Sequence, residues 1–302
     1  MLKPYLSWVI LGGTLFFLAT TLRIHWREVV EIRVSQTGWL YLSIALLMTL
    51  LAHIWSGWVW SWILRSLHQP AQGMWGVLTY LKTNIAKYLP GNVWHFYGRV
   101  MASKAQGFSV GAATVSVVLE ALLMAAAALL LALCSYQTNL GLSLLALAGV
   151  LVGVHPRLLN PLIKLAAQAK RQGQEEHPLV RLDRYPVVPL LGELGFLGLR
   201  GLGFLAIVLA LMGTQPFPML PVLSAFSIAW MLGLVVPGAP GGIGVFEASM
   251  VALVDALLPT GILLAAVAFY RFISTSAEAI GAGLAYGYEH FGDRDFNSTD
   301  KH

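Results

Sequence analysis

The chain has 302 residues, of which 57% are hydrophobic and only 11% are charged, and its mean hydropathy is +0.72. Soluble domains carry about 25% charged residues, so this composition excludes an ordinary soluble protein and predicts an all-α integral membrane protein. The formal net charge of +5 gathers mainly in one loop, which indicates membrane orientation and contact with anionic lipid rather than nucleic acid. The single cysteine, Cys134, excludes an intramolecular disulfide.

The first apolar stretch, at residues 5–22, lacks the short core and cleavage site of a signal peptide, so we expect a retained span. A span needs about 20 apolar residues, and the stretches that qualify are approximately 5–22, 39–63, 110–134, 139–155, 189–213 and 261–288. Two further apolar stretches, about 75–98 and 219–258, are interrupted by proline and glycine. Residues 1–302 are therefore predicted to form a single transmembrane domain, a polytopic helical bundle of about six full spans plus two broken or re-entrant helical segments.

Lysine and arginine residues in the loops predict how the bundle is oriented. The loop at 156–188 carries six of them and is expected to be cytoplasmic. This orientation places both the N- and the C-terminus in the cytoplasm, with the chain in a plasma or inner membrane. The arginines of the loop at 23–38 conflict with it, because that loop is then outside.

Within the cytoplasmic loop, the segment "RLLNPLIKLAAQAKR" has Leu158, Leu162 and Leu165 at three- and four-residue spacing. This pattern predicts an amphipathic helix, which lies either on the membrane surface or against its own bundle. The last residues, 291–302, are polar and are predicted to form a disordered tail.

The order of these elements predicts an inverted repeat. Two spans, a broken segment and a third span follow one another in 1–138, and the same order returns in 139–290. The first half begins inside and the second begins outside, so the halves would be inverted copies. Broken backbone survives in hydrocarbon only where protein or a water-filled cavity surrounds it. Transporters with inverted repeats place such breaks at the substrate site.

The second break, "VVPGAPGGIGVFE" at residues 235–247, predicts an anion site. Prolines and glycines end one helix, and a new helix is expected to start near Ile243. The amides from Gly241 through Gly242 to Gly244 would then have no partner within the helix, and the helix dipole adds partial positive charge there. A lipid phosphate is the obvious anion in a membrane. Glu247 follows in the first turn, either as part of the site or as a helix cap.

The first break, "AKYLPGNVWHF" at residues 86–96, places Pro90 beside Gly91. We expect Lys87 and Arg99 to add full positive charge to the site, and the polar contacts are predicted from Asn92 and His95. A single Pro-Gly kink is common in membrane helices, whereas two breaks at matching positions with cations nearby indicate a binding site.

Ionisable side chains inside the spans are costly and are expected to face the bundle interior. Arg271 and Glu278 are seven residues apart and so share a helix face, while Glu120 lies in the middle of another span. The functional interpretation is a headgroup contact by Arg271, with Glu278 and Glu120 as counter-charges. The alternative is a structural ion pair. Glu193 lies near the predicted interface and Arg200 could snorkel, so neither is predicted as a site residue.

The two segments "YLPGNVWHFYGR" and "VVPGAPGGIGVFEASMV" resemble the signature segments of the lysylphosphatidylglycerol synthase transmembrane family, also called the flippase-domain family. The second fits a P-x-x-x-G-G-x-G-x-x-E pattern. The fitting residues are Pro237, Gly241, Gly242, Gly244 and Glu247, and in the first segment Pro90, Gly91 and Arg99. Many relatives have a Gly-Glu pair before that arginine, where this chain has Trp94 and His95.

This resemblance covers nearly the whole chain and implies a polytopic bundle that binds or translocates a lipid with a polar headgroup. Fused members carry a cytosolic aminoacyltransferase domain after the spans. Only a short tail follows them here, so a stand-alone member that does not aminoacylate lipids is expected.

The function that the sequence favours is flippase-like binding and translocation of a lipid or glycolipid with an anionic headgroup, and we expect no enzyme. The ligand would be a membrane phospholipid or a polyprenyl-linked glycolipid, with no cofactor, no metal and no nucleic acid. One alternative is an intramembrane enzyme acting on a polyprenyl phosphate or phospholipid, although H-E-x-x-H, G-x-S-x-G and P-loop motifs are missing from the sequence. The other is a non-catalytic membrane partner of a separate synthase or glycosyltransferase.

Overall fold

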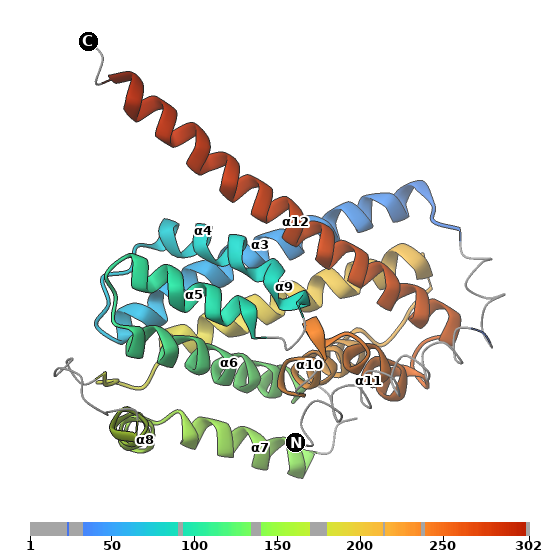
Figure 1. The fold of residues 1–302 in the computed structure, drawn as a ribbon. Helices are drawn as coiled ribbons and strands as arrows, with labels where there is room; N and C mark the ends of the chain where they lie inside the picture. Colours follow the sequence, from blue (N-terminus) through green and yellow to red (C-terminus); the bar gives the residue numbers. More distant parts are fainter. Residues whose placement is uncertain are drawn as a thin grey trace.

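The computed structural model describes residues 23, 33–89, 93–133, 140–169, 180–213, 215–236 and 239–299, and the regular elements in these ranges are helical (Figure 1). Within these ranges, four helices are long and apolar enough to cross a membrane. They are α3 (Gln36–Ser66), α6 (Val110–Ala132), α9 (Val187–Met212) and the part of α12 at Thr260–His290. This confirms a helical membrane protein with several spans, but not the predicted count of about six. The predicted span at 5–22 lies outside the described residues.

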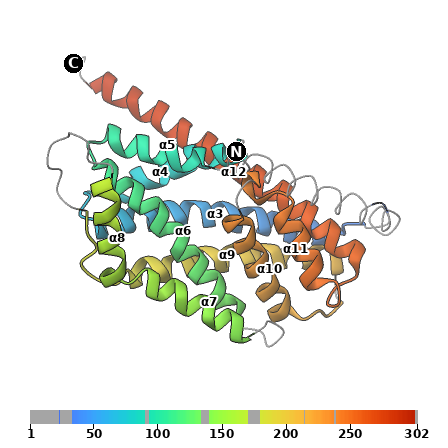
Figure 2. The same ribbon diagram turned by 60° about the horizontal axis from the view of Figure 1, so that its bottom comes forward.

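The predicted span at 139–155 is the short helix α7 (Leu140–Gly153), which bends by 61° into α8 (Pro156–Ala169). Counting this bent pair as one span raises the described total to five. Figure 2 shows α7 running along α6, with α8 turned away at its end. Fourteen residues at 1.5 Å each are too few to cross the hydrocarbon core, so apolar composition alone overestimated this span.

Helix α8 is amphipathic, as the leucine spacing predicts. Leu158, Leu162 and Leu165 are exposed, so this face does not pack against the bundle. The opposite side is tied to the protein, because the Asn160 side chain both donates to and accepts from the Leu182 backbone at 2.9 and 2.8 Å. Of the two interpretations of this helix, exposed leucines favour the membrane surface.

Both predicted breaks occur as interruptions between short helices. The first segment consists of α4 (Gly73–Asn84), the 3₁₀ turn η1 (Ile85–Tyr88) and α5 (Trp94–Ala105). The second consists of α10 (Met219–Val235), the turn η2 (Pro240–Gly242) and α11 (Val245–Val254). Each segment stands between two of the long helices, α3 and α6 or α9 and α12. The same order therefore appears twice, and the inverted relation of 1–138 and 139–290 stays a prediction.

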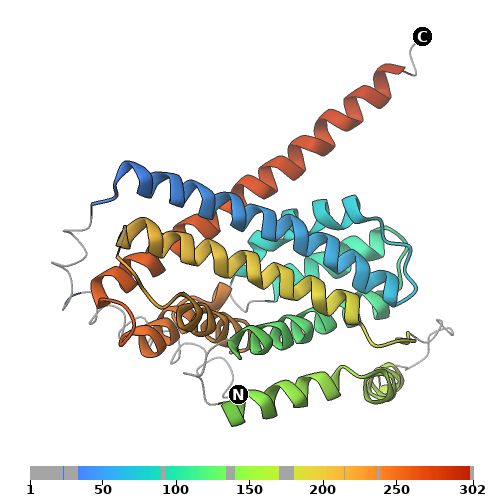
Figure 3. The same ribbon diagram turned by 180° about the vertical axis from the view of Figure 1, so that it is seen from behind.

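The centre of the bundle is the pair α3 and α9, which lie side by side and run in opposite directions (Figure 3). Small residues let their backbones approach closely. A Cβ added at Gly192 of α9 would lie 2.6 Å from a Val59 methyl group of α3, and the indole of Trp55 donates to the Gly192 carbonyl at 2.8 Å. Such close packing is how membrane helices associate without a hydrophobic driving force.

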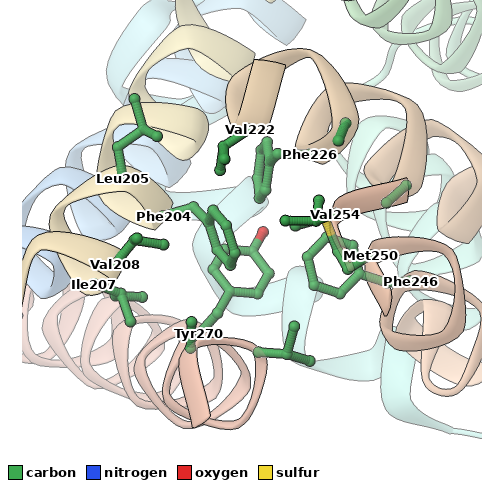
Figure 4. Close-up of a cluster of buried hydrophobic side chains, with 14 of the residues drawn as sticks. Phe204, Leu205, Ile207, Val208, Val222, Phe226, Phe246, Met250, Val254 and Tyr270 are labelled. Atoms are coloured by element: carbon green, nitrogen blue, oxygen red, sulfur yellow. The ribbon is translucent and has the colours of Figure 1, made fainter. Parts of the chain in front are cut away.

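Four aromatic side chains from the second half form one buried cluster (Figure 4). They are Phe204 of α9, Phe226 of α10, Phe246 of α11 and Tyr270 of α12. The Tyr270 ring lies 4.9 Å from Phe246, 5.4 Å from Phe226 and 5.7 Å from Phe204, centroid to centroid. Each such pair adds about 0.5–1.5 kcal/mol beyond its buried area. The cluster fixes both the start of α11 and the position of the Tyr270 hydroxyl.

The last helix, α12 (Thr260–Thr299), extends well beyond the bundle (Figure 1). Its backbone is helical through residues 291–299, where the sequence predicted part of a disordered tail. Polarity suggested disorder there, but a helix that is already nucleated gains a hydrogen bond with each added residue.

Candidate functional site

The two breaks meet around a cavity of about 100 Å³. The ring of Tyr88 in the first break packs against Gly241 in the second, where an added Cβ would lie 2.8 Å from a ring carbon. Seven of the predicted site residues line the cavity. They are Lys87, His95, Arg99, Glu120, Gly241, Gly242 and Arg271. Residues that are far apart in the sequence therefore surround one polar space, as the matching breaks predicted.

Lys87 anchors the first break to α12. Its ammonium lies 2.5 Å from Oε1 of Glu278, whose side chain is fully buried. His53 of α3 shares the same oxygen, with Nε2 at 3.3 Å. Beside Lys87, the Tyr88 hydroxyl lies 3.2 Å from the Thr275 hydroxyl of α12. The contacts that hold the first break in place therefore come from Glu278 and Thr275 of the neighbouring helix α12.

Arg99 of α5 forms a buried ion pair with Glu120 of α6. The guanidinium also lies over the Tyr80 ring, 4.3 Å from its centroid, which adds a cation–π contact. The sequence offered Glu120 as a counter-charge for Arg271. In the structure its partner is Arg99, because α5 folds back against α6.

Arg271 of α12 binds the second break. Its Nε donates to Glu247, and its two terminal nitrogens donate to the carbonyls of Gly241 and Gly242, both at 2.8 Å. The expected counter-charge Glu278 instead pairs with Lys87. The correction has a geometric reason, because side chains seven residues apart start about 10 Å from each other along the helix and reach different neighbours.

The amides of the second break are mostly occupied. Gly242 N donates to the Ala239 carbonyl at 2.9 Å, and Gly244 N donates to Oε2 of Glu247 at 2.6 Å. Helix α11 begins at Val245 rather than near Ile243. Of the two roles expected for Glu247, the structure shows the helix cap. The prediction that the Gly242 and Gly244 amides are free to bind an anion is wrong, because both already have acceptors. Positive charge reaches the cavity through side chains instead.

Arg200 of α9 also lines the cavity, although its position in the sequence did not predict it as a site residue. Its side chain does not snorkel, since only 4% of the residue is exposed. It donates to the Tyr270 hydroxyl, and to the Ser274 hydroxyl at 2.9 Å, while His53 Nε2 lies 3.4 Å away. An arginine in an apolar helix was the available signal, and its burial should have been expected.

A sequence profile described as "Lysylphosphatidylglycerol synthase TM region" matches residues 6–280. The chain belongs to this family. The match includes both breaks and every described residue that lines the cavity, so this member of the lysylphosphatidylglycerol synthase transmembrane family has its polar cavity inside the family region. Among proteins with curated descriptions, none matches the chain significantly.

The remaining predicted site residues of this family member lie in three different situations. Pro90, Gly91 and Asn92 are outside the described residues, as is Pro237 of the second motif. Gly244, Glu247 and Glu278 do not line the cavity. Glu247 and Glu278 hold the lining side chains Arg271 and Lys87, and Gly244 donates to Glu247. His95 lines it with its Nδ1 buried and without a hydrogen-bond partner in the described ranges.

Several lining residues were not predicted to be in the site. These are His53, Tyr80, Asn84, Phe96 and Tyr270, and also Ser274, which the sequence places only on the shared helix face of Arg271 and Glu278. In the described part of the chain, no group of three histidine, cysteine, aspartate or glutamate side chains is placed to hold a metal ion. That the predicted residues bind a ligand remains a prediction, and the structure shows which of them line the same cavity.

Proposed function

We propose that the cavity binds the anionic headgroup of a membrane lipid and that the chain moves such lipids between leaflets, as a flippase does. One observation carries the proposal: four cationic side chains, from different elements, line one cavity inside an apolar bundle. They are Lys87, Arg99, Arg200 and Arg271. Cations are expensive within a bilayer and accumulate where an anion or an ion pathway needs them.

The size of the cavity indicates which part of the lipid it takes. About 100 Å³ accommodates a phosphate group with some water, and it is too small for acyl chains. The headgroup would therefore enter between the helices while the acyl chains stay in the surrounding lipid. Membership of a lipid-related transmembrane family supports this class of ligand. We infer a plasma or inner membrane location, with cytoplasmic termini, and no catalytic role.

The two breaks supply a route for movement. Each is joined to α12 by an ion pair, Lys87–Glu278 in the first and Arg271–Glu247 in the second. A phosphate that enters the cavity competes with the carboxylate for the same cation. Exchange of one partner for the other would loosen one break while the second stays closed, which is the requirement for alternating access.

The test is a leaflet-accessibility assay with the purified chain in proteoliposomes. A lipid with an anionic headgroup and a fluorescent acyl chain is incorporated, and quenching from outside reports its transfer. We expect faster transfer than in protein-free vesicles and a loss of at least tenfold in Lys87→Gln, whereas Lys164→Gln on exposed α8 behaves as the wild type.

The same experiment separates the alternatives. Mass spectrometry of the vesicle lipids would detect a product of changed mass if the chain were an intramembrane enzyme. A non-catalytic partner would give neither transfer nor product. Transfer at the protein-free rate, with correctly folded protein, would overturn the proposed function.

A further inference from the structure

The charges around the cavity do not balance pair by pair. Three of its four cations have a carboxylate partner. The pairs are Lys87–Glu278, Arg99–Glu120 and Arg271–Glu247. Arg200 is the exception, since its contacts in the described ranges are two hydroxyl groups, an imidazole and the face of the Tyr270 ring, 4.9 Å from the guanidinium carbon, and none of these carries a negative charge. One positive charge therefore faces the cavity without a negative partner from the described part of the protein.

The contacts of Arg200 also leave donor capacity unused. Its Nε is buried without a hydrogen-bond partner in the described ranges. The Tyr270 and Ser274 hydroxyls accept from one terminal nitrogen and orient the guanidinium, and neither compensates its charge. A buried charge without a counter-ion is costly, and it persists where a ligand supplies that counter-ion.

The nearest candidate for an internal counter-ion on the same helix does not fill this role. Glu193 precedes Arg200 by seven residues, or about 10 Å along α9, and it does not line the cavity. Its carboxylate is fully buried and lies in the field of Glu120 and Arg99 instead. Arg200 and Glu193 therefore belong to different surroundings.

We propose that Arg200 binds the phosphate of the headgroup and that the site takes a phosphodiester, which carries one negative charge. This inference rests on the proposed function and adds the residue and the charge of the ligand. A planar guanidinium matches phosphate oxygens through paired N–H donors. One phosphodiester balances the one unpaired cation, whereas a phosphomonoester carries nearly two charges at neutral pH and leaves an excess.

The binding test uses the full chain in a neutral detergent and dioleoyl phosphatidylmethanol, a phosphodiester lipid without an amine. Native mass spectrometry counts bound lipid over a titration. Arg200→Gln is expected to weaken binding at least tenfold. Arg200→Lys should recover part of that loss, because lysine restores the positive charge but not the paired N–H donors of the guanidinium. The matched control, Arg65→Gln, changes an exposed arginine outside the cavity and should bind as the wild type.

The outcomes separate this inference from the proposed function. Wild-type protein that binds no anionic lipid would overturn both. Wild-type binding that Arg200→Gln leaves intact would overturn the role of Arg200 alone. If Arg200→Gln and Arg200→Lys bind equally weakly although their thermal unfolding matches the wild type, the charge of Arg200 is not what the lipid needs.

Two further ligands test the charge and the source of the phosphate. Dioleoyl phosphatidate at pH 8.5 carries a second negative charge and should bind several-fold more weakly than the diester. Equal or tighter binding would overturn the preference for one charge. Inorganic phosphate is added as a competitor, and we expect no displacement at the concentrations at which the lipid binds. Displacement there would overturn the lipid as the source and identify free phosphate as the ligand.

Discussion

The two breaks look alike in sequence but are stabilised in different ways. The second has a contact of its own, because the Gly244 amide donates to Glu247, and Arg271 of α12 adds bonds to the carbonyls of Gly241 and Gly242. The first is attached to α12 through Lys87 and a hydroxyl contact of Tyr88. Both breaks are thus attached to α12, and the second has its own helix cap in addition. We expect the second, the rigid break, to keep its shape while the first, the movable break, moves.

The largest expected effect is that of Glu247→Gln. This change removes the partner of Arg271 and weakens the cap of α11, so two contacts of the rigid break are lost together. Leaving a buried charge unpaired costs about 3 kcal/mol, which thermal unfolding in detergent would register as a clear fall in Tm.

Its matched control is Glu289→Gln. Glu289 pairs with Lys82 at 2.5 Å, but its side chain is 43% exposed, so we expect a loss below about 1 kcal/mol. If both substitutions lowered the unfolding free energy equally, the Arg271–Glu247 pair would stabilise the protein no more than an exposed ion pair does.

The next effect is that of Gly242→Ala, which tests the backbone of the rigid break. Gly242 has a φ of +70°, and an added Cβ would lie 2.9 Å from the Gly233 carbonyl oxygen. Left-handed strain and this contact together should cost about 2 kcal/mol in unfolding free energy. Gly149→Ala in α7 meets no atom within 4 Å and should be neutral or slightly stabilising. A tolerated Gly242→Ala would show that the loop can rearrange.

The last substitution, Lys87→Gln, tests the movable break. Glu278 is fully buried and would keep only His53 as a neighbour, so the stability loss should be about 3 kcal/mol, close to that of Glu247→Gln. Lipid transfer should also fall at least tenfold, as described above. Transfer that falls no further in Lys87→Gln than in Glu247→Gln, at equal amounts of folded protein, would contradict the comparison.

Much of this arrangement could be predicted from the sequence, and the remainder had specific physical obstacles. Proline and glycine located both breaks, because these residues interrupt helices regardless of their surroundings. The partners of the charged residues were not predictable, since Arg271 reaches Glu247 on another helix rather than Glu278 on its own. Helical periodicity gives the face of a residue, and only the packing of helices gives its neighbour.

Two errors came from treating residues singly. Arg200 was expected to be able to snorkel because long side chains can reach the interface, yet Tyr270 and Ser274 retain it inside. The amides at Gly242 and Gly244 were expected to be free because helix starts leave donors unpaired. Local acceptors, the Ala239 carbonyl and the Glu247 carboxylate, satisfy them. Both corrections depend on contacts that exist only after the chain has folded.

Helix α12 carries the attachments of both breaks on one stretch, with Arg271 holding the second and Glu278 holding the first. Rotation of this helix about its long axis would therefore shift Arg271 and Glu278 together. The second break would keep the cap between Gly244 and Glu247 during that rotation, so the same rotation would displace the first break further than the second.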